Sequence, residues 1–386
     1  MPEPKFLKAD AIVNFPQVER QIQSFWCEQD IFRKSLELRK GCPPFIFHEG
    51  PPTANGVPHN GHVLTRVVKD LFLRYRTMRG HYVPRKAGWD THGLPVEVEV
   101  EKELGIHGKA EIEQFGVERF ITRCIDSVFR YTQDWERMTE RIGFWVDLSD
   151  AYVTYHRSYV ESVWWALSEL FRKDLLYRGH KVVWWWAQGG TALSSAEVGL
   201  GYKTVDDPSV YVVFPLVDEP ETSLLVWTTT PWTLPSNMYA AVKPDVDYVQ
   251  VTDGDRKLIV AAALREVTEG KLKRRLPVER HLKGKELVGK RYRPPFPDYY
   301  RRYGERTVEL KGGGTEAMFW KVLAADFVEL DQGTGLVHEA PAFGEVDHDL
   351  HREIVSGYVR PEEVPLLCAV NPDGTFNENV ALLSGQ

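Results

Sequence analysis

Two histidines stand at the start of a predicted helix, where they could bind phosphate. The segment 58–62, with the sequence PHNGH, follows a loop rich in glycine and proline. A helix N-terminus offers unpaired N–H groups and the positive end of the helix dipole, which both suit an anion. His59 and His62 could therefore donate hydrogen bonds to oxygens that gain charge as pyrophosphate leaves. Taken alone, such a pair more often only caps a helix.

The elements around this segment have the order of a nucleotide-binding βαβ unit. Residues 45–48 and 82–87 predict two short strands, the first of them buried, and the apolar spacing from Val63 to Tyr75 predicts an amphipathic helix that ends at Gly80. Such a unit forms part of a parallel sheet, with the ligand at the helix N-terminus. No G-x-x-x-x-G-K-[ST] motif follows the first strand, which excludes a P-loop ATPase.

The rest of the chain predicts further helices and then a different domain. Helices are expected over residues 14–40, 111–143 and 157–177. Short apolar runs separated by turn residues then predict strands at 181–186, 210–214, 224–228, 248–251, 258–262 and 336–338. We therefore expect an α/β fold in residues 1–200, with a Rossmann-like nucleotide-binding half, and an inserted, mainly β, barrel-like domain in residues 201–386.

Composition is that of an ordinary soluble protein. The 386 residues are 43% hydrophobic and 27% charged, with a net charge of −7 that argues against a protein coating nucleic acid everywhere. No apolar run of about 18 residues predicts a membrane helix. The start MPEPKFLKAD has no apolar signal core, and the four cysteines form no CxxC pair. We expect a cytoplasmic monomer without a disulfide framework.

Charge is distributed unevenly along the chain. Ten basic residues fall between Lys271 and Arg293, opposed only by Glu279 and Glu286. A patch of this kind could lie along a phosphate backbone. The ordinary alternative is a solvated surface, which a charge run alone favours.

Several longer strings carry a resemblance to a known family. The segment HNGH resembles the HIGH signature of class I aminoacyl-tRNA synthetases. The strings GPPTANG (50–56), GWDTHGLPVE (88–97) and WTTTPWTLPSN (227–237) resemble the isoleucine-specific branch, whereas the valine and leucine relatives carry different residues at these places. The resemblance runs along nearly the whole chain, in order and at the expected spacing. It implies a Rossmann-like catalytic half with an inserted editing domain.

The resemblance also implies roles in amino-acid activation. ATP, with Mg²⁺, would be contacted by Asn55, His59, Gly61 and His62, and the two histidines would be catalytic. Gly61 would let the adenine ring lie on the backbone. Isoleucine would bind against Gly50, Pro51 and Asp90, because the Asp90 carboxylate would hold the substrate ammonium. The isoleucine carboxylate would attack the α-phosphate, so catalysis would come from positioning and charge stabilisation.

A second site is implied because a hydrophobic pocket cannot exclude a substrate that is one methylene smaller. The resemblance assigns hydrolytic editing of valine attached to tRNA(Ile) to this site. Asp347 would anchor the ammonium and His338 would exclude isoleucine, and the other pocket residues would be Thr228, Thr229, Thr230, Trp232 and Asn237. Threonine hydroxyls can hold the terminal adenosine and orient a water, although three threonines alone also fit ordinary strand propensity.

Neighbouring side chains leave the assignment around Asp347 open. His348 and Asp349 are close enough in sequence to be confused with the editing residues. With His338, Asp347 and His351 they could also suggest a metal site, whose geometry this spacing does not predict. No residue is nominated as the base that activates the water.

The chain departs from the family at two places. Many relatives carry a CxxC zinc knuckle before the insertion, but the string WWWAQGGTALS (184–194) places Trp186 and Gly189 where the cysteines would be. No zinc is expected there. The KMSKS loop and the anticodon-binding domain are also missing, so the resemblance implies a catalytic half and an incomplete editing domain that activate isoleucine poorly on their own.

Three other interpretations remain. The chain could come from a paralogue for another branched-chain amino acid, or be a free-standing editing or tRNA-binding module. HNGH and GWDTHG argue against the second, because an editing module needs no ATP site. A generic nucleotide-binding enzyme with an insertion would require the motif matches to be chance.

Overall fold

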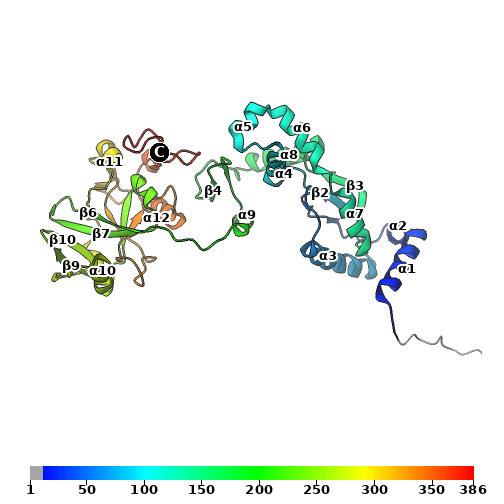
Figure 1. Ribbon diagram of the computed structural model, residues 1–386, viewed down its shortest axis with the longest axis horizontal. Coiled ribbons are helices and arrows are strands. Elements are labelled where there is room, and N and C mark those ends of the chain that lie inside the picture. Colours follow the sequence, from blue (N-terminus) through cyan, green and yellow to red (C-terminus); the bar gives the residue numbers. More distant parts are fainter. Residues whose placement is uncertain (1–11) are drawn as a thin grey trace, which may run out of the picture. The chain divides into compact units, whose positions relative to one another are not determined.

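The computed structural model describes residues 12–386, apart from the side chain of Leu200. It separates between Arg178 and Gly179 into two units, called unit 1 and unit 2 below (Figure 1). The expected domain boundary at residues 200 and 201 stays a prediction. The N-terminal stretch in which no secretion signal is expected lies outside the described residues.

Unit 1 contains the predicted βαβ unit. Its sheet has three parallel strands in the order β1-β2-β3, with bounds Phe47–His48, Arg85–Trp89 and Asp147–Val153. Helix α3 (Asn60–Met78) connects β1 to β2 and begins within the HNGH segment, and Gly80 follows it with a φ of +86°. The strand–loop–helix–strand prediction is confirmed. The other helices are α1 (Phe15–Glu28), α2 (Ile31–Glu37), α4 (Leu94–Leu104), α5 (Gly108–Phe115), α6 (Val117–Val128), α7 (Thr132–Arg141) and α8 (Arg157–Arg172).

Two long helices of the sequence prediction are wrong, and both break where the backbone turns left-handed. The helix expected over 14–40 is divided into α1 and α2 at Asp30, which has a φ of +49°. The helix expected over 111–143 is divided into α5, α6 and α7, with Gly116 at a φ of +105° between the first two. A residue with a positive φ cannot continue a right-handed helix, whatever the apolar spacing around it.

The strands of unit 1 also differ from the prediction. The first was expected to be buried, but β1 has only two residues and the neighbouring Ile46 is 69% exposed. The second lies at 85–89 rather than 82–87, because Tyr82 forms only an isolated bridge with Pro44. Strand β3 was not predicted, since its sequence DLSDAYV lacks a clear alternation of apolar residues.

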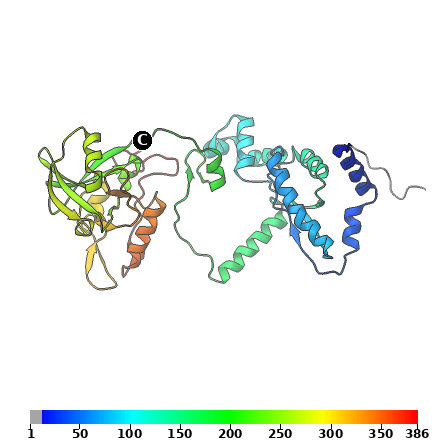
Figure 2. The same cartoon turned by 90° about the horizontal axis from the view of Figure 1, so that it is seen from below.

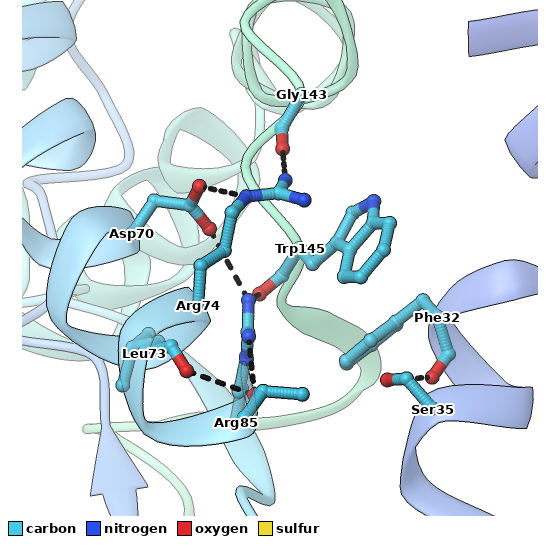
Figure 3. Close-up of polar contacts among 9 residues, drawn as sticks. Phe32, Ser35, Asp70, Leu73, Arg74, Arg85, Gly143 and Trp145 are labelled. Carbon is cyan, nitrogen blue, oxygen red and sulfur yellow. Dashed lines mark hydrogen bonds and ion pairs between the residues drawn. The ribbon is translucent and has the colours of Figure 1, made fainter. Parts of the chain in front are cut away.

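A buried ionic cluster fixes α3 against β2 (Figure 3). The Arg85 side chain is 1% exposed and donates to Asp70 Oδ1 at 3.2 Å and to the Trp145 carbonyl at 3.1 Å. The other oxygen of Asp70 accepts from Arg74, which also donates to the Gly143 carbonyl. Burial lowers the pKa of Arg85 to about 10, against the opposing charge of Asp70, so Arg85 is still cationic at neutral pH. One carboxylate thus holds two guanidinium groups.

Unit 2 is built on an eight-stranded mixed sheet (Figure 1). Its order is β11-β9-β10-β7-β15-β8-β14, and β6 pairs with β7 beside this path. The strands are β6 (Val210–Pro215), β7 (Thr222–Thr228), β8 (Tyr239–Val242), β9 (Asp247–Asp253), β10 (Arg256–Ala261), β11 (Val278–Lys283), β14 (Val322–Ala324) and β15 (Val337–Glu339). The predicted runs from 210 to 338 are confirmed as strands.

The remaining elements of unit 2 cover and connect this sheet. Helix α12 (Glu345–Ser356), drawn in orange in Figure 2, lies beside this sheet. Its Leu350, Ile354 and Val355 pack against the core of buried side chains on the sheet. The short elements are α9 (Ser195–Leu200), α10 (Arg265–Leu272), α11 (Pro297–Tyr303), β12 (Thr307–Glu309), β13 (Thr315–Ala317) and the 3-10 turns η1 (Pro231–Ser236), η2 (Ala262–Leu264), η3 (Gly284–Glu286) and η4 (Pro361–Glu363). No strand pairing among the described residues closes the sheet, so a barrel stays an expectation.

A small hairpin forms in the string WWWAQGGTALS (184–194), where Trp186 and Gly189 stand in place of the cysteines that the resemblance would imply. Strands β4 (Trp185–Trp186) and β5 (Thr191–Ala192) pair antiparallel, so the strand expected at 181–186 is limited to two residues. A Cβ added at Gly189 would lie 2.1 Å from Cε3 of Trp186. The indole of Trp186 therefore lies directly over Gly189, and the two residues contact each other through carbon atoms.

Substitution of Gly189 by alanine should open this hairpin. The added methyl group must displace the Trp186 ring, and overpacking of this kind costs about 1–3 kcal/mol. We expect amide exchange at Leu193, whose N–H donates to the Trp184 carbonyl at 2.8 Å, to become about tenfold faster or more. Gly199→Ala is the control, since a Cβ there meets nothing within 4 Å. Equal exchange in both variants would contradict the packing role.

The remaining global expectations concern thiols and membranes. The four cysteines are free thiols in the structure. Within residues 12–386 no helix has both the length and the apolar character needed to cross a membrane.

Candidate functional site

The loop after β1 lies beside the end of β2, at the carboxyl edge of the parallel sheet. Thr53 forms a parallel bridge with Asp90. The Ala54 N–H donates to the Asp90 carbonyl at 2.9 Å, and the Asp90 N–H donates to the Pro52 carbonyl at 3.1 Å. These bonds continue the β1–β2 pairing and bring the string GPPTANG next to Asp90. Ligands of open α/β sheets bind at this edge.

The two histidines form a reciprocal cap on α3. His59 Nδ1 accepts from the Gly61 N–H at 3.1 Å, and His62 Nδ1 accepts from the His59 N–H at 3.1 Å. Their rings lie 3.7 Å apart between centroids, and the His62 ring contacts Trp135 edge-on. Burial lowers the pKa of His62, and the charges of His59 and Arg66 act in the same direction. With both Nδ1 atoms used as acceptors, each Nε2 carries the proton of the neutral ring.

Gly61 leaves room for the His59 ring. A Cβ at this position would lie 2.9 Å from Cε1 and 3.1 Å from Nδ1 of His59. The expected contact of adenine with the Gly61 backbone stays a prediction. The helix cap alone already explains why a glycine stands at this position. The sequence interpretation did not foresee this contact, because it depends on the rotamer of His59.

The other residues predicted for activation surround the same loop. Asn55 donates through Nδ2 to the Pro95 carbonyl at 2.7 Å, which leaves its carbonyl oxygen for a ligand. The Gly50 carbonyl accepts from Lys69, whose Nζ also pairs with Glu49 at 2.7 Å, and Pro51 follows in the loop. Within residues 12–386 the Asp90 carboxylate has no ion pair or side-chain hydrogen bond. It is therefore available to a cationic group.

Unit 2 contains a cavity of about 450 Å³ at the ends of β7 and β15. Six of the seven predicted editing residues line it, namely Thr228, Thr229, Thr230, Trp232, His338 and Asp347. The Thr230 N–H donates to Thr228 Oγ1 at 3.1 Å, and the Trp232 ring packs edge-on against Phe343 with a centroid distance of 4.9 Å. Segments about 100 residues apart in sequence thus form a common pocket.

His338 is a neutral side chain with both ring nitrogens engaged. Thr233 donates its hydroxyl to the Thr230 carbonyl at 2.8 Å, so its oxygen accepts from His338 Nε2 at 2.9 Å. His338 Nδ1 in turn accepts from Asn237 Nδ2 at 2.8 Å. Burial lowers the pKa of His338 to about 3, which agrees with this tautomer. The ring can occupy space in the cavity, but no nitrogen lone pair is available to act as a base.

Asn237 differs from the other predicted residues because it does not line the cavity. It lies behind His338, where Nδ2 also donates to the Tyr239 carbonyl at 2.8 Å and Oδ1 accepts from Tyr292 at 2.7 Å. Both N–H groups of its amide and its carbonyl oxygen are thus bonded inside the protein. Asn237 therefore positions His338 and does not itself contact the cavity.

Asp347 contributes a carboxylate to the lining of the cavity. It lies in the first turn of α12, where the helix dipole favours negative charge, and its Oδ2 accepts from the Ala340 N–H at 2.7 Å. Burial raises the pKa of Asp347, while the Ala340 hydrogen bond and Glu339 oppose that shift. A Cβ at Gly344 would lie 2.5 Å from the Asp347 carboxyl carbon, so the glycine makes room for this group.

The neighbouring histidines and Asp349 point to other partners. His348 Nδ1 lies 3.1 Å from the Pro341 carbonyl, and His351 Nδ1 lies 3.1 Å from the Tyr239 hydroxyl. Asp349 is exposed and lies 3.9 Å from Arg352. Within residues 12–386 no three His, Cys, Asp or Glu side chains are arranged to hold a metal ion.

The basic stretch of unit 2 surrounds the edge strand β11. Five of its ten basic residues form ion pairs, with partners Asp253, Glu286, Asp247, Glu219 and Glu305. Among the described residues the other five have no such pair, namely Lys271, Lys273, Arg275, Lys285 and Arg293. A phosphate-binding surface and a solvated surface both remain compatible with this arrangement.

Three residues of the cavity region were missed by the sequence interpretation. Thr233 holds His338, and Phe343 lines the cavity. Glu339 follows His338 in β15, with its side chain fully buried. Because side chains alternate along a strand, Glu339 would be expected on the face of β15 opposite to His338. An acidic residue at such a buried strand position was the signal that could have identified it.

Comparison with known proteins bears on the whole chain. Residues 21–345 match the family described as tRNA synthetases class I (I, L, M and V). An isoleucine–tRNA ligase of Thermus thermophilus is 49% identical over 366 residues, which are 94% of this chain and 32% of that protein. Isoleucine–tRNA ligases of Clostridium acetobutylicum and Streptomyces coelicolor are 44% and 46% identical, over 97% and 100% of this chain and 34% and 35% of their own lengths. The chain thus spans about a third of these relatives.

Proposed function

This chain belongs to the class I tRNA synthetases, and we propose that it is part of an isoleucine–tRNA ligase that activates isoleucine with ATP and edits valine from tRNA(Ile). The resemblance of its motifs to the family agrees with the 44–49% identity to isoleucine–tRNA ligases. The activity, the substrates and the tRNA partner of the whole protein are part of this proposal, as are its monomeric state and cytoplasmic location.

The activation half is supported by the loop at the carboxyl edge of the sheet. Asp90 would bind the isoleucine ammonium, next to Gly50 and Pro51. His59 and His62 would donate their Nε2 protons to the phosphates of ATP with Mg²⁺, since their Nδ1 atoms are already acceptors in the helix cap. Asn55 would contact ATP through its carbonyl oxygen. This arrangement positions the reactants and stabilises charge, and it requires no covalent enzyme intermediate.

The editing half is supported by one observation above all. The cavity of unit 2 combines the Asp347 carboxylate, the threonine hydroxyls and the neutral His338 ring. A carboxylate fits the ammonium of a mischarged amino acid, and the hydroxyls fit ribose and an attacking water. The His338 ring would fill the space that the larger isoleucine side chain needs. The water would attack the ester with help from the ribose hydroxyl, because His338 cannot accept its proton.

Deacylation of valyl-tRNA(Ile) by this chain tests the editing half. We expect Asp347→Ala to reduce hydrolysis about 100-fold, because loss of one partner of a buried charge pair costs on the order of 3 kcal/mol. Asp349→Ala is the matched control in the same helix, since the Asp349 side chain is 70% exposed, and it should retain hydrolysis within about twofold. Equal activity in both variants would show that Asp347 binds no ammonium.

A separate experiment distinguishes the alternative functions. ATP–pyrophosphate exchange should be measured with isoleucine, valine and leucine on the protein extended to the length of its relatives. Fastest exchange with isoleucine supports the proposal, and fastest exchange with valine or leucine indicates a paralogue. Deacylation without any exchange would favour an editing module, for which the cavity within unit 2 is the supporting observation.

A further inference from the structure

The buried acid next to the editing cavity suggests a further residue of that site. We propose that Glu339 is a neutral carboxylic acid that positions Asp347 and shares one proton with it, so that the two carboxyl groups together carry a single negative charge. The inference rests on the proposed editing function and assigns a positioning role to a residue that does not itself line the cavity.

Burial is the first observation behind this assignment. The Glu339 side chain is 0% exposed, and neither of its carboxyl oxygens has a hydrogen-bond donor in the part of the chain that the structure describes. An ionised carboxylate without a donor or a cation would be strongly destabilised in such a place. A protonated carboxyl group is tolerated there because it carries no charge, and it has one O–H to donate.

In the part of the chain that the structure describes, no cation pairs with Glu339. Lys321, which precedes β14, pairs with Glu316 and donates to the Tyr358 hydroxyl. The hydroxyls of Tyr292 and Tyr239 are bonded to Asn237 and His351. On its own strand the neighbouring His338 is neutral, and on α12 His348 bonds to the Pro341 carbonyl. The charge that acts on Glu339 is that of Asp347.

The position of Asp347 places it beside Glu339. Its Oδ2 accepts from the N–H of Ala340, the residue directly after Glu339, at 2.7 Å. Burial raises the pKa of Glu339 well above its usual range, and the negative charge of the neighbouring Asp347 acts in the same direction. In return Glu339 opposes the rise in the pKa of Asp347. Two such carboxyl groups cannot both ionise at low cost, and one proton belongs to the pair.

This arrangement has a consequence for the substrate. A pair that carries one negative charge balances the single ammonium group of a mischarged amino acid. The proton of Glu339 would keep Asp347 oriented and ionised at a pH where a buried aspartate alone would be more fully protonated. Hydrolysis should therefore fall on the acidic side as the Asp347 carboxylate gains a proton.

The pH dependence of valyl-tRNA(Ile) deacylation by the full chain tests the role. Glu339→Leu removes the donor, so we expect the acidic midpoint to move up by about one pH unit. Glu339→Gln keeps a neutral donor and should restore the midpoint of the unsubstituted chain. Thr222→Val is the control, because it removes another buried, unbonded side-chain oxygen from the same sheet and should not move the midpoint. A downward shift in both Glu339 variants would mean that the residue is ionised and would overturn the inference.

Infrared spectroscopy of the chain with ¹³C-labelled glutamate provides a readout without activity. The carbonyl stretch of a protonated carboxylic acid should be present at neutral pH and absent in Glu339→Gln. Absence of that band from the unsubstituted chain would overturn the inference even if deacylation is normal. A band without any deacylation would contradict the proposed editing function and leave the protonation of Glu339 established.

Discussion

Replacement of Asp70 by asparagine should lower the free energy of unfolding of unit 1 by about 3 kcal/mol. Asp70 is the carboxylate that neutralises Arg85, a side chain that is 1% exposed and also faces the second guanidinium, Arg74. Asparagine keeps the shape but leaves two cations side by side, one of them buried without a counter-ion (Figure 3). For a unit of this size the melting temperature should fall on the order of 10 °C, as measured by calorimetry.

The matched control for this prediction is Asp150→Asn. Asp150 pairs with Lys86 of the same sheet at 2.9 Å, but its side chain is 73% exposed. An exposed ion pair contributes at most about 1 kcal/mol, so this variant should melt within a few degrees of the unsubstituted chain. Similar losses in both variants would contradict the special role of the buried cluster.

The substitution Asp70→Asn should also weaken the activity of the proposed activation site. Asp70 lies in α3, which begins at the two histidines, and Arg85 lies in β2, which ends next to Asp90. Their ion pair therefore sets the distance between the phosphate-binding and ammonium-binding ends of the proposed site. We expect ATP–pyrophosphate exchange by the extended protein to be weakened at temperatures where Asp70→Asn is still folded.

If the cavity of unit 2 has the proposed editing function, replacement of His338 by alanine should allow it to hydrolyse isoleucyl-tRNA(Ile). The ring is held by Thr233 and Asn237, with both nitrogens engaged, so it is a rigid wall. Its removal creates room for more than one methylene, and one methylene in an apolar pocket is worth about 1–3 kcal/mol. The preference for valyl over isoleucyl ester should therefore fall about 10- to 200-fold in parallel deacylation assays.

His348→Ala serves as the control for this loss of selectivity. His348 is buried in the same unit, but it bonds to the Pro341 carbonyl and does not line the cavity. Its replacement should leave the preference for valine within about twofold. If His338→Ala hydrolysed valyl-tRNA(Ile) normally and isoleucyl-tRNA(Ile) not at all, the exclusion role would be wrong.

The parts of the fold that follow local patterns could be predicted from the sequence. The βαβ unit and five of the eight strands of the unit 2 sheet were predicted, because apolar spacing and turn residues determine them within a few residues. Strands β8, β11 and β14 were not predicted. The helix breaks at Asp30 and Gly116 were missed because a left-handed backbone does not interrupt the apolar pattern. Strand β3 is fixed by pairing with β2, a contact more than 50 residues away.

The same division applies to the candidate site. The motif strings identified residues that the structure gathers at one sheet edge and around one cavity. What each side chain can do there depends on bonds between distant segments, such as those from Thr233 and Asn237 to His338. These bonds fix the tautomer of His338 and place Asn237 behind the cavity. Neither result could be read from spacing alone.

The contact of Trp186 with Gly189 has a consequence for the conditions in which this protein can fold. A knuckle closed by thiolates depends on the supply of zinc, and its ligands can be oxidised or titrated. An indole ring packed on a glycine does not depend on zinc, on the oxidation of thiols or on their titration, because it is held by carbon contacts. The geometry of this hairpin should therefore be the same in a zinc-starved cell, under oxidative stress and in the presence of a strong chelator.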